Sequence, residues 1–358
     1  MFKWMWLAAV FFLVSCKSIG PQILNNDRYH YNEAMSYSNN QELLLNMVRL
    51  RYNESTMAIG VGNISGSTSL QKGGNLAGFI PFPPLKGFAG PSLGINPNIN
   101  YTDNPIVTYI PLDTQKFTQS FLSTLSLADI GLLLQSSWSI PRVMRVGLQR
   151  VGNAYNAPSS ARPTSSHVPQ YQNFIDMTYV LRRMQIDDAL TGFYQKKDTV
   201  EELILVIRPD YRLTANEKRV LRKAGVEIYN HKIIFTNRPA PHKVFEITRS
   251  MLGILNYLSK GMDTPAEDVS RNILTQTVYA NGGVFDWQNV LRGMMRIHFS
   301  TTPPNDAYIS IIYRGRWYYI KDSDTDSKET LMLLSNMSGL IQDSSIDNSL
   351  VPALTRAV

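Results

Sequence analysis

Two short stretches of this 358-residue chain have the residue types and spacing of known catalytic motifs. Residues 90–94, GPSLG, match the G-x-S-x-G motif of serine hydrolases, in which a strand precedes the serine and a helix follows it. Here a proline-rich loop precedes Ser92 and Pro97 follows it, so the match predicts no nucleophile. Residues 69–72, SLQK, have S-x-x-K spacing, but the companion S-D-N and K-T-G motifs are missing. The sequence therefore predicts no catalytic residue.

Asp322, Asp324 and Asp326 have the spacing of the first three ligands of a calcium-binding loop. Such a loop needs glycine at its sixth position and glutamate at its twelfth, where this chain has Ser327 and Leu333. We expect these acids to cap the helix that follows, because negative charge stabilises a helix N-terminus; a weak cation site is the alternative. The five histidines are not paired at metal-binding spacing, so no metal and no cofactor are predicted.

Residues 313–319, YRGRWYY, combine two cations with aromatic rings around a tight turn. Arg314, Arg316 and Trp317 could stack on a sugar or clamp an anionic group, so we take them as candidate ligand contacts. The alternative is that alternating aromatic residues of a hairpin form core on one face and rim on the other.

The only cysteine, Cys16, follows Lys3 and an apolar run of eleven residues from Trp4 to Val14. That run has the length of a signal-peptide core and is too short to span a membrane. The junction Leu13-Val14-Ser15-Cys16 resembles the bacterial lipoprotein box. The resemblance implies cleavage before Cys16 and acylation of its thiol and amine, which gives stable membrane anchoring. The alternative is an ordinary secreted protein with a stray cysteine.

The formal net charge is +7 and the sequence pI is about 9.3. No nucleic-acid-binding signature accompanies this basic balance, so it favours contact with anionic lipid headgroups over nucleic acid. The partners we expect are the lipid bilayer through Cys16, and either a second copy of the chain or another envelope protein. Lys17 after the cysteine, by resemblance to enteric sorting rules, favours the outer membrane of a bacterial envelope.

Three segments, taken in order, resemble a family of uncharacterised bacterial lipoproteins of outer-membrane type. They are NQELLLNMVRLRY, then IVTYIPL followed by LLLQSSWSIPRVMRVGLQR, and AYISIIYRGRWYYIKDSDTDSKETLMLL. The resemblance implies an envelope lipoprotein and brings no activity or site residue with it.

Glycine-rich alternating segments at 58–70 and 92–109 predict the two strands of a β-hairpin over residues 58–110. The loop between its strands is unusually apolar and carries five candidate interaction residues: Phe79, Ile80, Phe82, Leu85 and Phe88. This loop could cover the protein's own core, pack on a neighbouring subunit, or enter the lipid interface.

Apolar residues recur at helical spacing from about 29 to 52 and over most of 113–151, and segments typical of both strands and helices follow. This order predicts an α+β fold. The N-terminal half is expected to be helical with the glycine-rich hairpin, and the C-terminal half to contain mixed strands and helices with a three-stranded meander. The expected divisions are a signal peptide (1–15), a lipidated tether (16–28), the helical region (29–151), a linker (152–170), an α+β domain (171–345) and a tail (346–358).

These features favour a membrane-anchored envelope lipoprotein that acts as a noncatalytic binding or assembly component. We expect it to be oligomeric, with the 58–110 hairpin as the interaction element. One alternative is a pore-forming or channel lipoprotein that uses this hairpin, and a second is an envelope hydrolase.

Overall fold

The computed structural model describes residues 20–56, 59–77, 94–111, 115–158 and 168–345. The chain divides into two units, the hairpin of residues 57–114 and a larger unit formed by the rest. Helices and two sheets alternate along the larger unit, which confirms the predicted α+β class. Among the residues described, no helix is both long and apolar enough to cross a membrane.

The larger sheet of this unit has six strands in the spatial order β4-β3-β8-β7-β6-β5. Only the β7–β8 pair is parallel. The strands are β3 (Leu148–Val151), β4 (Ala154–Tyr155), β5 (Leu190–Lys197), β6 (Val200–Ile207), β7 (Lys232–Thr236) and β8 (Val244–Thr248). The sheet therefore joins segments from both sides of the predicted linker.

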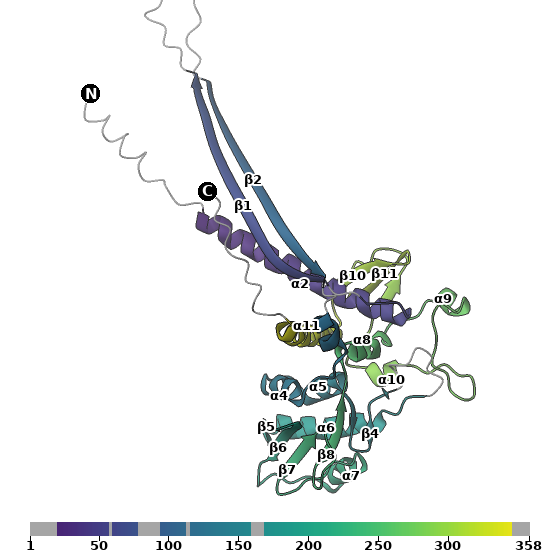
Figure 1. Ribbon diagram of the computed structural model, residues 1–358. Coiled ribbons are helices and arrows are strands. Elements are labelled where there is room, and N and C mark those ends of the chain that lie inside the picture. The colour runs from purple at the N-terminus through teal and green to yellow at the C-terminus, as the bar shows by residue number, and fades with distance from the viewer. Residues whose placement is uncertain (1–19, 57–58, 78–93, 112–114, 159–167, 346–358) are drawn as a thin grey trace, which may run out of the picture. The chain divides into compact units, whose positions relative to one another are not determined.

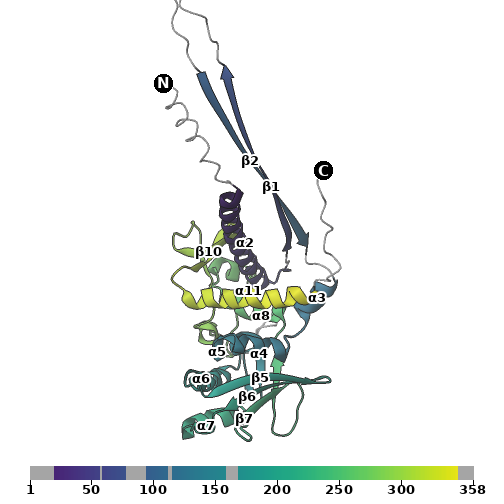
Figure 2. The same cartoon turned by 90° about the vertical axis from the view of Figure 1, so that its left-hand side faces the viewer.

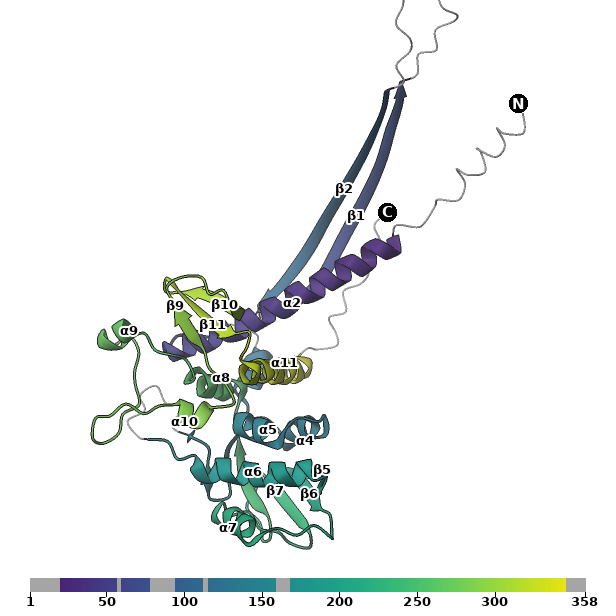
Figure 3. The same cartoon turned by 180° about the vertical axis from the view of Figure 1, so that it is seen from behind.

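Four helices accompany this sheet, and two of them begin with the capping box that satisfies free backbone N–H groups. Ser126 caps α4 with Asp129, and Thr214 caps α7 with Glu217. In all three views α4 and α5 lie between the six-stranded sheet and the layer that contains α8 and α11 (Figures 1 to 3). The helices are α4 (Leu127–Gln135), α5 (Ile140–Gly147), α6 (Gln172–Ile186) and α7 (Ala215–Lys223).

The smaller sheet contains the three predicted C-terminal strands, β9 (His298–Ser300), β10 (Ala307–Tyr313) and β11 (Arg316–Lys321). Its order is β10-β11-β9, so β11 is the central strand and the predicted meander order is wrong. The remaining described helices of the larger unit are α2 (Gly20–Arg51), α3 (Gln115–Leu122), α8 (Met251–Ser259), α9 (Ala266–Ser270), α10 (Gln288–Leu291) and α11 (Thr325–Ser345), and α2 packs against β10. The carboxylate of Asp324 accepts a hydrogen bond from the Ser327 backbone N–H at the start of α11, as the capping interpretation predicted.

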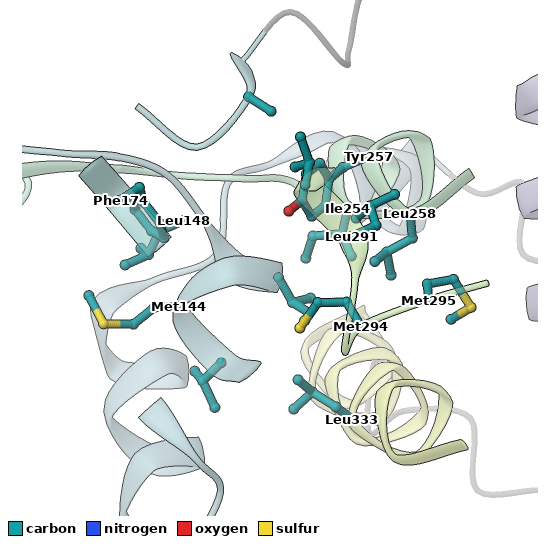
Figure 4. Packing of buried hydrophobic residues seen from close by; sticks show 14 of the residues in the cluster. Met144, Leu148, Phe174, Ile254, Tyr257, Leu258, Leu291, Met294, Met295 and Leu333 are labelled. Carbon is teal, nitrogen blue, oxygen red and sulfur yellow. The ribbon is translucent and has the colours of Figure 1, made fainter. Parts of the chain in front are cut away.

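One hydrophobic core runs through the larger unit. Figure 4 shows Met144 and Phe174 on one side of this core and Leu258 and Leu333 on the other, with Met294 between them. All of these side chains are almost fully buried.

The predicted linker does not separate two domains, because its first residues belong to this core. Residues 154–155 form β4, and Asn156 is completely buried. The Asn156 amide donates to the carbonyl oxygens of Arg145 and Leu148, at 2.8 and 2.7 Å. A polar residue can be buried when its hydrogen bonds are satisfied, so composition alone was misleading here. Residues 159–167 lie outside the described part of the chain.

The hairpin unit consists of two antiparallel strands, β1 (Ile59–Ala77) and β2 (Gly94–Pro111). A register shift between Val61 and Asn63 interrupts an otherwise continuous ladder. Strands of 19 and 18 residues are far longer than the three to ten residues that are usual. β1 also extends beyond the 58–70 segment in which the sequence predicts its strand.

Candidate functional site

Six of the predicted site residues lie outside the described residues: Cys16, Phe79, Ile80, Phe82, Leu85 and Phe88. Their predicted roles in lipidation and in interaction therefore stay predictions. The structure places the other three, Arg314, Arg316 and Trp317, at the turn between β10 and β11.

Positive backbone φ angles at Arg314 and Gly315, 49° and 73°, form this turn. Two such residues in succession suit the twist of a tight hairpin. The Arg316 guanidinium donates to both oxygens of Asp268, at 3.1 and 3.2 Å, and to Glu267 at 2.7 Å. Arg314 donates to Glu54 at 2.5 Å and lies over the ring of Tyr52.

Tyrosine hydroxyls complete this arginine–carboxylate cluster. The hydroxyl of Tyr52 donates to Asp268 at 2.6 Å and lies 2.5 Å from the hydroxyl of Tyr318. Burial, followed by the hydrogen bond to Asp268, raises the pKa of Tyr52 well above its usual range, so this phenol stays protonated. The Tyr313 hydroxyl donates to Glu54, and that hydrogen bond holds the pKa of the Glu54 carboxyl below its usual range.

Both arginines of the predicted ligand site therefore already have carboxylate partners within the chain. Tyr318 and Ile320 are buried while Trp317 and Tyr319 are half-buried, which is the alternation expected of a core face and a rim face. This arrangement favours a structural role for the cluster, which connects α2, α9 and the β10–β11 hairpin.

A pocket of about 250 Å³ lies beside this cluster, where α2 and α8 end. It is lined by Arg51, the last residue of α2, and Lys260, the residue after α8. The two residues are 5% and 8% exposed, so both cations are largely removed from water.

Neither cation forms an ion pair with a carboxylate in the part of the chain that the structure describes. Arg51 Nε is enclosed without a hydrogen bond. Burial lowers the pKa of Arg51 to about 10. Burial, and then the nearby charge of Arg51, lowers the pKa of Lys260 to about 8.

The other polar groups of the pocket are mostly occupied. The carboxylate of Asp263 contacts His298 at 2.9 Å and Arg296 at 3.4 Å. The Trp287 indole N–H donates to the Thr277 hydroxyl at 3.0 Å, which leaves the hydroxyl proton of Thr277 able to donate. The exposed carboxylate of Asp286, also in the lining, accepts from the Gln288 backbone N–H at 2.9 Å. The pocket thus presents two cations, a hydroxyl donor and an aromatic wall, with the carboxylates of Asp263 and Asp286 in the same lining.

No sequence motif marks this pocket. The sequence shows that Arg51 follows Leu44 by seven residues and Met47 by four, which places it on the buried face of α2. That spacing is the signal that could have identified Arg51 as a buried cation. Lys260 gives no comparable signal, because the turn after α8 determines where it lies.

The hairpin is the second candidate site, because its register divides the residues between two unlike faces. From Ile64 onward, one face carries Ile64, Gly66, Thr68, Leu70, Lys72, Gly74 and Leu76 opposite Val107, Pro105, Asp103, Tyr101, Ile99, Pro97 and Ile95. The other face carries Ser65, Ser67, Ser69, Gln71, Gly73, Asn75 and Ala77 opposite Ile106, Asn104, Thr102, Asn100, Asn98, Asn96 and Gly94. Successive residues of a strand lie on opposite faces, so the hairpin has one mainly apolar face and one mainly polar face.

Comparison of the chain with protein-family models, with curated proteins and with solved structures finds no match. Within the described ranges, no group of three or more His, Cys, Asp or Glu side chains is arranged to hold a metal ion. The candidate function therefore depends on the geometry of the chain itself.

Proposed function

We propose that this chain is a membrane-anchored lipoprotein of the bacterial envelope that acts as a noncatalytic assembly component. In this proposal the lipid on Cys16 holds the protein at the outer membrane, and the β1–β2 hairpin joins it to further copies of the same chain. The amphipathic register of the hairpin is the observation that carries the proposal.

The length of the hairpin supports assembly. Each strand has its partner on one side only, so 18 or more residues of each backbone have an unpaired edge within the described hairpin. Unpaired edges of this kind pair readily with other strands, and an isolated two-stranded hairpin is marginally stable in water. Pairing with the hairpin of another copy would satisfy these edges.

A pore-forming lipoprotein is the second candidate, because the same register fits strands that separate lipid from water. A membrane strand needs about 9 to 11 residues, and both strands exceed that length. Lys72 and Asp103 lie on the mainly apolar face and weaken this candidate. Stepwise conductance of the lipidated protein in planar bilayers would favour it over assembly without a pore.

Two neighbouring residues on opposite faces of the hairpin provide a matched test of assembly. Leu70→Ser changes the apolar face and Gln71→Ser changes the polar face. Burial of one leucine contributes about 1.5–3 kcal/mol, so Leu70→Ser should weaken self-association by about tenfold or more per contact. Gln71→Ser should leave self-association unchanged. Sedimentation velocity of the lipidated protein in detergent measures both, and a wild-type protein that stays monomeric would contradict the proposal.

The anchor has its own test. Cys16→Ser should abolish incorporation of radiolabelled palmitate and release the protein from the membrane fraction. Continued labelling of this variant would contradict lipidation at Cys16, whatever the hairpin variants show.

A further inference from the structure

We propose that the pocket at the ends of α2 and α8 binds the phosphate group of a phosphate monoester, with Arg51 and Lys260 as its cationic ligands. This inference does not depend on the assembly role of the hairpin. It follows from the contrast between these two residues and the other buried cations of the larger unit.

The other buried arginines all have partners. Arg142 pairs with Asp326 and Glu329, at 2.9 and 2.8 Å. Arg145 donates to the backbone carbonyl oxygens of residues 290 and 292. Arg249 donates to four backbone carbonyl oxygens and lies over the ring of Tyr257. Each of these three charges thus has partners through its terminal nitrogens, although Nε of Arg142 and Nε of Arg145, like that of Arg51, make no hydrogen bond.

Arg51 and Lys260 depart from this pattern in the described chain, because both are more than nine-tenths buried and line the same pocket, yet neither forms an ion pair with a described carboxylate. Of the two carboxylates in the lining, Asp263 pairs with Arg296 and His298, and Asp286 is exposed and accepts from the Gln288 N–H. A buried charge without a partner is strongly unfavourable, and two of the same sign also repel each other. The pair is stable only if an anion enters the pocket or if Lys260 gives up its proton.

The helix ends do not supply the missing anion. Cations at a helix C-terminus are often held by the last free carbonyl oxygens. In α2 the carbonyl oxygens of residues 48–50 accept hydrogen bonds from the backbone N–H groups of residues 52–54. After α8 the carbonyl oxygens of residues 257–259 accept from the N–H groups of residues 260–262. Backbone N–H groups thus already engage these carbonyl oxygens.

A phosphate monoester fits the composition of the pocket. It carries close to two negative charges at neutral pH, which match the two cations, and a guanidinium binds its oxygens in a bidentate manner. The Thr277 hydroxyl proton can donate to a third oxygen. Phe285 and Trp287 provide a wall against which the organic part of the ligand can pack. A volume of about 250 Å³ accommodates a phosphate with a small substituent.

Isothermal titration of the full-length protein tests this site, with inorganic phosphate and glycerol phosphate as probes and acetate as a singly charged comparison. We expect saturable binding of both phosphates and weaker binding of acetate. Arg51→Gln and Lys260→Gln should each weaken phosphate binding at least tenfold. Lys223→Gln, at an exposed position of α7, is the matched control and should bind like the wild type. Equal binding of acetate and phosphate, or no loss in the two pocket variants, would overturn the proposal.

A footprint on the wild-type protein covers the case in which a pocket variant does not fold. Phosphate should protect Lys260, but not Lys223, from acetylation by acetic anhydride, as measured by mass spectrometry. Equal acetylation of Lys260 with and without phosphate would overturn the proposal.

A flotation assay with vesicles that contain phosphatidic acid distinguishes the source of the phosphate. If these vesicles compete with inorganic phosphate for the protein and glycerol phosphate does not bind, the site is assigned to a lipid headgroup. The reverse result assigns it to a soluble monoester, and binding of neither overturns the site.

Discussion

Arg51 and Tyr52 are neighbours at the end of α2, and they belong to two regions that treat buried charge in opposite ways. Tyr52 joins a cluster in which Arg316 is matched by Asp268 and Glu267. Arg51 faces a pocket in which neither it nor Lys260 forms an ion pair with a described carboxylate, although Asp263 and Asp286 also belong to the lining. Carboxylates are thus present within a few residues of Lys260, at 263, 267 and 268, but they pair with other cations. The difference indicates that the cluster holds the fold together and that the pocket is available to a ligand.

The largest effect should come from breaking the cluster. Asp268→Asn removes a buried negative charge that neutralises Arg316 and accepts from Tyr52. Removing one partner of a buried ion pair costs about 3–5 kcal/mol, so the free energy of unfolding in urea should fall by about that amount. Glu267→Gln is the matched control, because Glu267 is exposed and should contribute less than about 1 kcal/mol. Equal effects of the two variants would show that the cluster is not the structural element described here.

Glu246 is a buried titratable group outside the pocket, and it tests how burial alone changes the protonation of a side chain. Its Oε2 atom has no hydrogen bond, and burial, followed by the charge of Glu201, raises the pKa of Glu246 to about 8. The folded protein therefore holds this proton between about pH 4.5 and 8 while the unfolded chain has lost it. The free energy of unfolding should therefore fall as the pH rises through that window, by up to about 1.4 kcal/mol per pH unit.

Glu246→Gln should remove this contribution to the pH slope and make the protein more stable at pH 8. Urea denaturation at several pH values measures the slope for the variant and the wild type. The same slope in both proteins would show that Glu246 is ionised in the fold.

In the pocket we expect a smaller change in the free energy of unfolding, and an increase instead of a decrease. Lys260→Met removes a buried charge rather than a partner, and replacing buried charge by apolar side chains often stabilises a protein by about 1–4 kcal/mol. Without phosphate the variant should therefore be as stable as the wild type or about 1–2 kcal/mol more stable. With phosphate present the wild type alone should gain stability, because a ligand stabilises the state that binds it. A large loss of stability in the variant without phosphate would show that Lys260 has a structural partner.

The sequence predicted the parts of this molecule that depend on local pattern. Apolar periodicity identified the helices around Leu44 and Leu127, and alternation identified the strands around Ile309 and Tyr318. Long-range pairing was not predictable in the same way: β11 rather than β10 pairs with β9, and β3 pairs with β8, which is remote from it in the sequence.

The two arginine sites show the same limit. Sequence analysis selected Arg314 and Arg316 because aromatic residues surround them, but their carboxylate partners Glu54 and Asp268 are remote in the sequence. Arg51 and Lys260 are separated by more than two hundred residues, and only the packing of α2 on α8 brings them to one pocket. Whether a charge is compensated is a tertiary property, so no local pattern reports it.

The most direct measurement is the number of protons taken up when phosphate binds at pH 8.5, obtained by calorimetry in buffers of different ionisation enthalpy. With a pKa of about 8, Lys260 is mostly neutral at this pH in the empty pocket, and a bound dianion should raise that pKa and charge the amine. The account predicts uptake of a large fraction of one proton by the wild type and none by Lys260→Gln. Phosphate binding to the wild type without proton uptake, or with equal uptake by the variant, would contradict the claim that Arg51 and Lys260 form an anion-binding site.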